Sequence, residues 1–439
     1  MRFRCAVANG LWLASAARDA HRFRANLHRV AEVQWSMVGN LTEFRDRHPI
    51  ATWAERRTGF SPSLPVERWV RTSGSSGAAK EIPYTRALRH EFDRAIAPWI
   101  VNLFTHHPGA FAGEAYWSIS PDAESDEEVL GPIQRRLVRA VQAVPSTVRL
   151  TNENFREETL RHLTRCRTLS LISVWHPSFL DLLVGDLDTE ATWPKLRVIS
   201  CWADANAANA AAALAKKFPH ATIQPKGLLS TEGFVTIPYD GENVLAYRSH
   251  FYEFRSGDEV RLAHELEVGK RYEVILTTGG GLSRYATEDV VEVTGYREQA
   301  PLLKFVGRAS HISDHFGEKL NEIFVRERLQ LALRGIPHAF AMLACDRDAY
   351  VLYLQSDAEV PLDALEQSLC ESYHYDLARR LGQLQPLRLM RVRDGAATYL
   401  RVKSATQILG DVKIPALDRE QGWSERFSAV PPAPSTPAP

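Results

Sequence analysis

The sequence predicts an α/β fold in two parts: a large N-terminal domain with mixed β-sheets and helices, and a small α+β C-terminal domain. The first observation is an alternation that begins near residue 169. Apolar runs suited to buried strands, LSLISVW (169–175) and LRVISCW (196–202), alternate with helical stretches such as the Ala-rich segment 205–217. The second is a group of strand-like runs separated by Gly-rich turns later in the chain. The third is length, because 439 residues allow two or three domains.

The first hundred residues are predicted to be mainly helical. Residues 10–48 and 86–106 show apolar side chains at helical spacing, for example Phe23, Leu27 and Val30. The basic start followed by the apolar stretch 5–17 also resembles a signal peptide, which is the alternative for this segment. The continued helical spacing favours an amphipathic helix packed on a core.

The later elements define the domain boundaries. Runs 272–278, 290–296 and 302–308 are predicted strands, and a helix is predicted to start near Phe316. A hairpin around Arg347, a helix over 361–382 and a strand over 387–392 then complete the small domain. We therefore predict a large domain over 1–308, a small lid domain over 309–425 and a disordered Pro-rich tail over 426–439.

Composition excludes some functions. Lys plus Arg number 53 and Asp plus Glu also number 53, so a dedicated nucleic-acid or anionic-membrane binder is not expected. The five cysteines are widely spaced and form no CxxC pair, which favours a reducing, cytoplasmic location over a disulfide framework. No apolar run approaches the roughly 20 residues that span a bilayer.

The segment from Thr72 to Lys80, TSGSSGAAK, has the composition of a phosphate-binding loop. Glycines let backbone N–H groups approach an oxyanion, hydroxyls add hydrogen bonds, and a lysine neutralises phosphate charge. The loop is not of the Walker A type, because Lys80 lies three residues after Gly77. A flexible Ser/Gly linker is the alternative. The candidate phosphate-binding residues are Thr72, Ser73, Gly74, Ser75, Ser76, Gly77 and Lys80.

Four ordered segments carry a family resemblance. TSGSSGAAK resembles the phosphate loop of the adenylate-forming superfamily, which includes acyl-CoA and aryl-CoA synthetases, luciferases and peptide-synthetase adenylation domains. GLLSTEGF (227–234) resembles its adenine and metal motif, 272–296 its ribose segment and 302–322 its hinge segment. The details HFYEF (250–254), TTGGGL, FVGR and FGEKLNE are most similar to the auxin-responsive Gretchen Hagen family of acyl acid amido synthetases and its bacterial homologues.

The resemblance implies a ligase that uses ATP and Mg²⁺. A carboxylic acid would react with ATP to give an acyl-adenylate and pyrophosphate, and an amine, such as an amino acid, would then displace AMP. A CoA or carrier-protein thiol as acceptor is the alternative within the same chemistry. A catalytically impaired nucleotide-binding homologue is a third hypothesis, suggested by Glu288 and by a short stretch before the phosphate loop. Neither nucleic acid nor membrane is an expected partner.

The resemblance also implies roles for individual residues. Thr72, Ser73, Ser75, Ser76 and Lys80 would contact the β and γ phosphates. Thr231 would hold the α-phosphate, and Glu232 would bind Mg²⁺, which prefers hard oxygen ligands. A helix-capping carboxylate is the alternative for Glu232.

Three further side chains complete the implied nucleotide site. Asp289 would accept hydrogen bonds from both ribose hydroxyls, and Arg308 would approach the phosphate or ribose with its planar fork. A surface ion pair is the alternative for either residue. Lys413 is the candidate catalytic lysine of the first half reaction, acting with Thr231, and a solvated lysine on an extended segment is its alternative.

Other residues have less specific roles. Trp175 and Trp202 are candidate walls of the acyl pocket, with buried core tryptophans as the alternative. His311 and His315 have the spacing of a helical metal pair, but no third ligand is evident. The resemblance instead implies a hinge over 309–314, with Glu318 near the acceptor channel. At Glu288 the family pattern has Gly, so a charge and a stiffer backbone lie beside Asp289.

Overall fold

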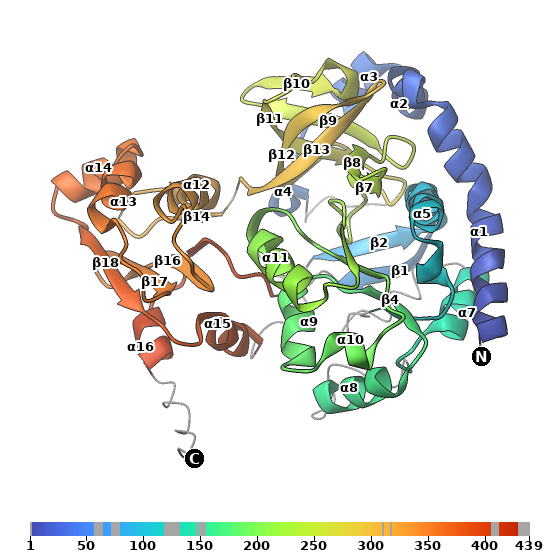
Figure 1. Cartoon of the computed structure of the whole chain (residues 1–439). Coiled ribbons are helices and arrows are strands. Elements are labelled where there is room, and N and C mark those ends of the chain that lie inside the picture. Colours follow the sequence, from blue (N-terminus) through green and yellow to red (C-terminus); the bar gives the residue numbers. More distant parts are fainter. Residues whose placement is uncertain are drawn as a thin grey trace, which may run out of the picture. The chain divides into compact units, whose positions relative to one another are not determined.

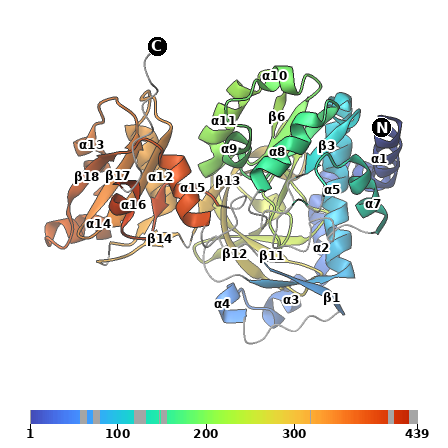
Figure 2. The same cartoon turned by 90° about the horizontal axis from the view of Figure 1, so that it is seen from below.

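The computed structural model divides into two compact units, Met1–Val306 and Gly307–Pro439. It describes residues 2–56, 65–71, 80–117, 132–145, 148, 155–309, 311–316, 318–404 and 412–428. Figures 1 and 2 show the elements of both units. Each unit is described by itself below.

A parallel four-stranded sheet lies in the first unit, with the strand order β3-β4-β5-β6. The predicted apolar runs at 169–175 and 196–202 contain two of its central strands, which is confirmed by their pairing. Side chains of α1, α5 and α7 form an apolar cluster on one face of this sheet, together with Leu171 and Val198. The strands are β3 (Glu114–Trp117), β4 (Leu169–Ser173), β5 (Val198–Cys201) and β6 (Thr222–Pro225).

Helices surround this sheet (Figure 2). The prediction of a helix over 86–106 is confirmed by α5, which starts after the N-cap Thr85 and ends at His106. The helix predicted over 205–217 is also present, as a short turn η3 followed by α11. The helical elements are α5 (Arg86–His106), η2 (Pro108–Phe111), α7 (Pro132–Val141), α8 (Phe155–Arg165), α9 (Pro177–Val184), α10 (Thr189–Thr192), η3 (Ala205–Ala207) and α11 (Ala208–Lys217).

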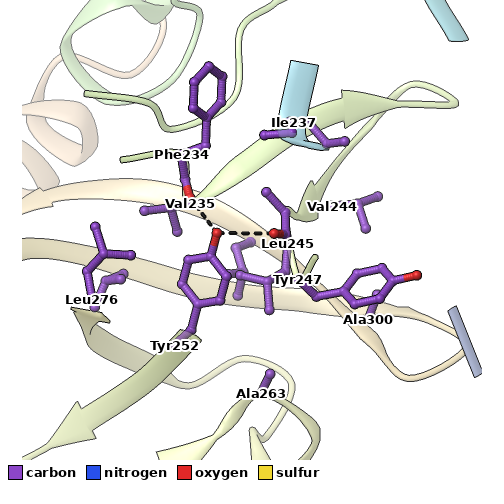
Figure 3. Packing of buried hydrophobic residues seen from close by; sticks show 14 of the residues in the cluster. Phe234, Val235, Ile237, Val244, Leu245, Tyr247, Tyr252, Ala263, Leu276 and Ala300 are labelled. Atoms are coloured by element: carbon purple, nitrogen blue, oxygen red, sulfur yellow. Dashed lines mark hydrogen bonds between the residues drawn. The ribbon is translucent and has the colours of Figure 1, made fainter. Parts of the chain in front are cut away.

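A second, seven-stranded sheet has the order β10-β9-β11-β12-β13-β8-β7. Its buried side chains form a large core with residues of α5, and Figure 3 shows Tyr252 inside it. The strands predicted over 272–278, 290–296 and 302–308 correspond to three of its central strands. The strands are β7 (Thr236–Tyr239), β8 (Glu242–Leu245), β9 (Phe251–Ser256), β10 (Glu259–Leu262), β11 (Arg271–Thr277), β12 (Tyr285–Arg297) and β13 (Ala300–Arg308), with η4 (Ala263–Glu265) after β10.

The N-terminal prediction was wrong in one respect, because residues 10–48 are not one continuous helix. The chain breaks after Ala25 and again at Gly39, whose φ of 70° does not suit a helix, and Asn40 then caps the next helix through its side chain. The first helix packs along α5 (Figure 1). The elements are α1 (Arg2–Ala25), η1 (Leu27–Arg29), α2 (Val30–Val38), α3 (Leu41–Arg47) and α4 (Trp53–Arg56).

The second unit contains a four-stranded sheet with the order β18-β17-β16-β19. The predicted hairpin around Arg347 is confirmed, since β16 and β17 pair antiparallel over seven residue pairs. The predicted strand over 387–392 lies largely within β18, which pairs parallel with β17. The strands of this unit are β14 (Ile312–Ser313), β15 (Leu320–Asn321), β16 (Phe340–Asp346), β17 (Ala349–Gln355), β18 (Gln385–Arg391) and β19 (Leu417–Asp418).

Three boundaries in this unit differ from prediction. The helix expected near Phe316 starts at Glu322, and the segment 361–382 forms two helices, which leaves Tyr373 66% exposed. Residues 426–428, predicted to be disordered, belong to a helix whose Trp423 is fully buried. The helices are α12 (Glu322–Ala332), α13 (Leu362–Leu369), α14 (Tyr373–Arg380), α15 (Gly395–Ser404) and α16 (Trp423–Ser428).

All five cysteines are free thiols. Among the described residues, no helix is both long enough and apolar enough to cross a membrane.

Candidate active site

A tight turn places two of the predicted site residues. Ser230 and Gly233 close it through two backbone hydrogen bonds of 3.0 and 3.3 Å, and Thr231 and Glu232 lie between them. The Tyr84 hydroxyl, on β2 (Glu81–Thr85), donates to the Thr231 carbonyl at 3.0 Å. Because residues 230–233 form a turn outside any helix, Glu232 is not a helix cap, and that alternative is excluded.

Lys80 reaches this turn from a segment 152 residues away. Its ammonium contacts Glu232 Oε1 at 3.2 Å and the Tyr285 hydroxyl at 2.6 Å. The two charged side chains are 13% and 8% exposed, so solvent screens their attraction only weakly. The structure thus brings Lys80, predicted for phosphate binding, together with Glu232, predicted for metal binding. Tyr285, which the sequence analysis did not assign, joins them.

The other candidate phosphate-binding residues, Thr72, Ser73, Gly74, Ser75, Ser76 and Gly77, lie outside the described residues. The structure does describe the residues on either side of this segment. Arg71 ends β1 (Val66–Arg71) and is paired with Glu81, the first residue of β2. The described residues that flank this segment, Arg71 and Lys80, therefore lie at one paired strand end.

Asp289 lies on β12, four residues after Tyr285, and is 5% exposed. Its backbone N–H donates to Thr287 Oγ1 at 3.1 Å, and the Thr287 hydroxyl donates to the Val274 carbonyl at 2.9 Å. Between them, Glu288 adopts a φ of 66° where the pairing of β11 and β12 shifts register. A bulge therefore sets the backbone that carries Asp289.

Arg284, near the start of β12, holds the fold around the site. Its guanidinium binds the Glu253 carboxylate at 2.7 Å, and Arg45 binds the same carboxylate at 2.8 Å. Glu253 is 1% exposed, so this buried charge is compensated by two cations. The arrangement fastens the β12 segment to α3 and β9.

A second group of side chains follows the carboxyl ends of three adjacent parallel strands. Trp175 comes after β4, Trp202 after β5 and Lys226 after β6. The two indole rings lie 5.4 Å apart, and the Lys226 ammonium lies 4.5 Å from the Trp175 ring centroid. Both tryptophans are partly exposed, so they are not the fully buried core residues of the alternative reading. Sequence reasoning missed Lys226, although the carboxyl-edge rule for parallel sheets could have found it.

Asp204 belongs to the same edge. It accepts a hydrogen bond from the Asn243 amide at 3.2 Å. Burial raises the pKa of its carboxyl group, while Lys304, the Phe305 N–H and Asn243 act in the opposite direction. Burial also raises the pKa of the neighbouring Cys201 thiol to about 12, so this thiol is not poised as a nucleophile.

Arg308 and Lys413 lie in the second unit. Arg308 is the last residue of β13, two residues past Val306, and Lys413 lies in an extended stretch before β19. Gly307 is packed closely, since a Cβ there would lie 2.9 Å from Ile323. The roles of Arg308 and Lys413 remain predictions.

The predicted histidine pair has no support as a metal site. His311 and His315 lie in no helix, and His311 Nδ1 is 2.6 Å from the Glu322 carboxylate. No group of three possible metal ligands among His, Cys, Asp and Glu occurs in the described parts of the chain. The two histidines have different partners, Glu322 for His311 and Gln421 for His315.

The nearby Glu318 has a structural role in its loop. It is fully buried and accepts hydrogen bonds from the His315 and Phe316 N–H groups and from the Tyr350 hydroxyl. Within its own unit it is enclosed, and its place near an acceptor channel stays a prediction. This loop also delays the start of α12 to Glu322.

Comparison with known proteins identifies related sequences and folds. Residues 243–308 match the model of the GH3 family central domain. Over 201 residues the chain is 31% identical to a probable indole-3-acetic acid-amido synthetase GH3.9 of Oryza sativa subsp. japonica, covering 38% of this chain and 45% of that protein. Over 147 residues it is 31% identical to the indole-3-acetic acid-amido synthetase GH3.10 of Arabidopsis thaliana, covering 30% and 25%. The matches therefore span less than half the length of these relatives.

Solved structures extend the likeness to the fold of nearly the whole chain. A GH3.15 acyl acid amido synthetase has a TM-score of 0.72 at 16% identity, covering 93% of this chain and 95% of its own. A 2-hydroxyisobutyryl-CoA ligase in its postadenylation state has a TM-score of 0.52 at 11% identity, covering 89% and 86%. The chain thus has the α/β fold of acyl acid amido synthetases and regional homology to GH3 proteins. Because the named relatives are plant proteins, a bacterial branch gains no support.

Proposed function

We propose that this chain is an ATP-dependent ligase that activates a carboxylic acid as an acyl-adenylate and transfers the acyl group to an amine, such as an amino acid. The observation that carries the proposal is the contact among Lys80, Glu232 and Tyr285, which joins the predicted phosphate loop to the predicted metal motif. Homology to GH3 amido synthetases supports the same reaction class. The five free thiols support a reducing, cytoplasmic location.

The residues act by positioning charge. A carboxylate is a poor electrophile until its oxygen is joined to the α-phosphate and pyrophosphate leaves. Lys80, held at the rim of the Thr231–Glu232 turn, would stabilise the negative charge that moves onto pyrophosphate. Thr231 would bind the α-phosphate, and Asp289 would orient the nucleotide through the ribose, so the reacting atoms meet in a fixed geometry.

Glu232 fits a Mg²⁺ ion bound with the nucleotide. Mg²⁺ typically takes one or two protein carboxylates and fills its other positions with water and phosphate oxygens. Glu232 supplies such a carboxylate beside Lys80, within a turn fixed by backbone hydrogen bonds. When bound, the ion would neutralise phosphate charge.

The edge formed by Trp175, Trp202 and Lys226 is our proposed acyl side of the site. Two partly exposed indole rings suit an aromatic acid, and parallel α/β sheets bind ligands at this edge. The names of the relatives, which specify indole-3-acetic acid, point to the same class of acid.

The test is acid-dependent release of pyrophosphate from ATP and Mg²⁺, with hydroxylamine trapping of the acyl-adenylate across aryl, indolic and fatty acids. We expect a hydroxamate with at least one aryl or indolic acid. Lys80→Ala and Asp289→Ala should each lower the adenylation rate about 100-fold, the scale of one lost electrostatic contact to a reacting group. Lys270→Ala and Asp258→Ala are matched controls on the exposed surface and should retain wild-type rates.

Amino acids and CoA are then compared as acceptors. An amide product supports the proposal, and a thioester product supports the ligase of the alternative class. If no acid gives a hydroxamate while the protein still binds ATP, the chain is a nucleotide-binding homologue. Unchanged rates in both Lys80→Ala and Asp289→Ala would contradict the site assignment.

A further inference from the structure

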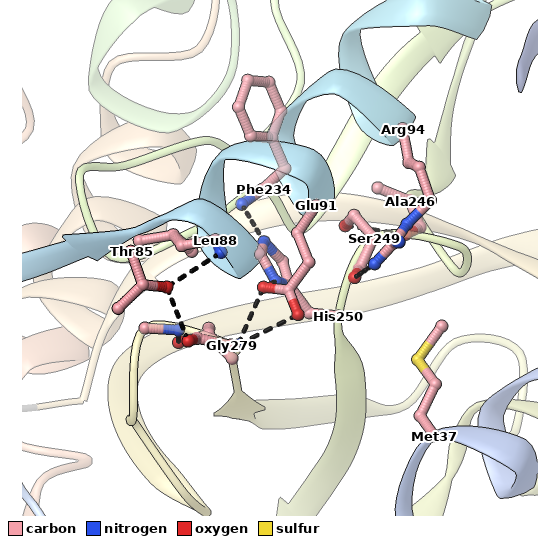
Figure 4. Close-up of polar contacts among 12 residues, drawn as sticks. Met37, Thr85, Leu88, Glu91, Arg94, Phe234, Ala246, Ser249, His250 and Gly279 are labelled. Atoms are coloured by element: carbon pink, nitrogen blue, oxygen red, sulfur yellow. Dashed lines mark hydrogen bonds and ion pairs between the residues drawn. The ribbon is translucent and has the colours of Figure 1, made fainter. Parts of the chain in front are cut away.

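We propose that His250 is a positioning residue, which fixes the Thr231–Glu232 turn by binding the backbone of Phe234. Glu253 of the segment HFYEF (250–254) binds Arg284 and Arg45, but His250 and Tyr252 have no role in the site as described so far. Its first residue precedes β9 and is 1% exposed. Figure 4 shows its imidazole between Phe234 and Glu91.

The hydrogen bonds determine the tautomer of this histidine. The Phe234 N–H donates to His250 Nε2 at 3.2 Å, so Nε2 is the unprotonated acceptor. The ring proton therefore resides on Nδ1, which donates to Glu91 Oε2 at 2.8 Å. Glu91 thus selects the tautomer whose Nε2 can accept a hydrogen bond from the N–H of Phe234, two residues after Glu232.

Tyr252, from the same segment, fixes the other polar group of Phe234. Its hydroxyl donates to the Phe234 carbonyl at 2.5 Å (Figure 3), and the side chain is fully buried. Two side chains from the short segment 250–252 therefore bind both the N–H and the C=O of Phe234, the residue that follows the turn. Such double fixation restricts the backbone that presents Glu232.

Close packing supports the same role. A Cβ at Gly233 would lie 2.9 Å from His250 Nε2 and 2.7 Å from a Leu276 methyl group. The imidazole is therefore pressed against the turn itself, and only glycine leaves room for it.

Glu91 connects the turn to a second part of the site. Its two oxygens accept the Gly279 N–H at 2.9 Å each, while the Thr85 hydroxyl donates to the Gly279 carbonyl at 2.8 Å. Gly279 lies six residues before Tyr285, whose hydroxyl contacts Lys80. The carboxylate on α5 thereby positions the histidine and the loop before β12 together (Figure 4).

The inference rests on the proposed function, and two isosteric variants separate its parts. In His250→Asn the side-chain amide can still reach Glu91, but no side-chain atom at this position accepts the hydrogen bond from the Phe234 N–H. In His250→Gln the carbonyl oxygen reaches the position of Nε2 and restores that acceptor. We would measure the Kd of Mg·ATP by calorimetry, kcat and KM for Mg·ATP, and Tm. His264→Asn is the control, because this ring contacts Trp35 and lies 4.0 Å from Glu265 but does not touch the turn.

We expect His250→Asn to weaken Mg·ATP binding about 10-fold, the effect of one buried hydrogen bond, and His250→Gln to recover most of that loss. Hydrogen exchange of the amides in 228–236 should be faster in His250→Asn than in the wild type or His264→Asn. Equal affinities in the wild type and both His250 variants, or equal losses in both variants, would overturn the inference. A wild type that binds Mg·ATP but forms no acyl-adenylate overturns the proposed function alone, whereas one that binds no Mg·ATP overturns both.

Discussion

Glu288 shows how one residue can shape the backbone beside the candidate nucleotide site. A left-handed conformation costs a side chain with a Cβ roughly 1–2 kcal/mol, and glycine avoids this cost. The conformation is enforced by the bulge opposite Val274, because Thr287 and Asp289 are tied on either side of it. The bulge, and not the identity of residue 288, therefore sets the path of β12.

We predict that Glu288→Gly raises the free energy of unfolding by up to about 1 kcal/mol, because the relieved strain exceeds the added entropy of the unfolded chain. Chemical denaturation would measure the change. Glu298→Gly, at an exposed turn with a φ of 54°, should gain a similar amount. Thr294→Gly, in the same strand without a positive φ, should lose stability. A destabilised Glu288→Gly alongside a stabilised Glu298→Gly would show that Glu288 makes a compensating contact.

At the scale of elements, α5 organises the candidate site. Lys80 and Tyr84 lie directly before it, Thr85 caps it, and Glu91 lies on its second turn. The TTGGG loop packs on this helix so closely that a Cβ at Gly279 would lie 2.6 Å from Ala87. The helix and the preceding strand β2 thus contact three parts of the site directly: the Thr231–Glu232 turn, His250 and the TTGGG loop.

We predict that Thr85→Ala lowers the free energy of unfolding by about 2 kcal/mol, because it removes the cap on Leu88 N–H and leaves the partly buried Gly279 carbonyl without this donor. Thr85→Ser keeps both hydrogen bonds and should stay within about 1 kcal/mol of the wild type. Denaturant titration of both variants would measure the difference. Equal losses of unfolding free energy in the two variants would show that the missing methyl group, and not the hydrogen bonds, accounts for the effect.

At the scale of the whole molecule, the free thiols report on packing in both units. Burial raises the pKa of the thiols of Cys166, Cys201 and Cys345 to about 12, with Glu114 adding to the effect at Cys166 and Glu318 at Cys345. At pH 8 these groups are protonated and therefore slow nucleophiles. Cys370 is the least buried of the five.

We predict that native protein at pH 8 shows at most one titratable thiol in an Ellman assay, and five in denaturant. Cys370→Ser should abolish the native signal because Cys370 is partly exposed. Raising the pH toward 12 should increase the rate for Cys166, Cys201 and Cys345, since the pH then approaches the raised pKa of each thiol. Two or more fast native thiols would show that one of the described cores opens.

Prediction from the sequence succeeded where local periodicity decides structure. The helix over 86–106 was found because its apolar residues have a regular helical spacing. The breaks at Ala25 and Gly39 were missed, since apolar residues keep a helical spacing across both. The start of α12 was missed because a buried carboxylate, Glu318, organises the preceding loop, and burial cannot be seen in a local pattern.

The sequence predicted several residues of the candidate site, but it did not predict which side chains contact one another. The resemblance of the Thr72–Lys80 loop and of GLLSTEGF named Lys80 and Glu232, which lie together. The Glu91–His250 pair escaped prediction because its partners are 159 residues apart and neither lies in a catalytic pattern. Long-range hydrogen bonding of this kind depends on tertiary structure alone.

The separation between Lys80 and Tyr285 has a consequence for synthesis of the protein. These two residues, which hold one ammonium and one hydroxyl 2.6 Å apart, are 205 positions apart in the chain. A ribosome adds about 5–20 residues per second, so ten seconds or more pass after Lys80 is made before its partner exists. During that interval the nascent chain cannot form this contact, so the candidate site is completed only after Tyr285 has been added.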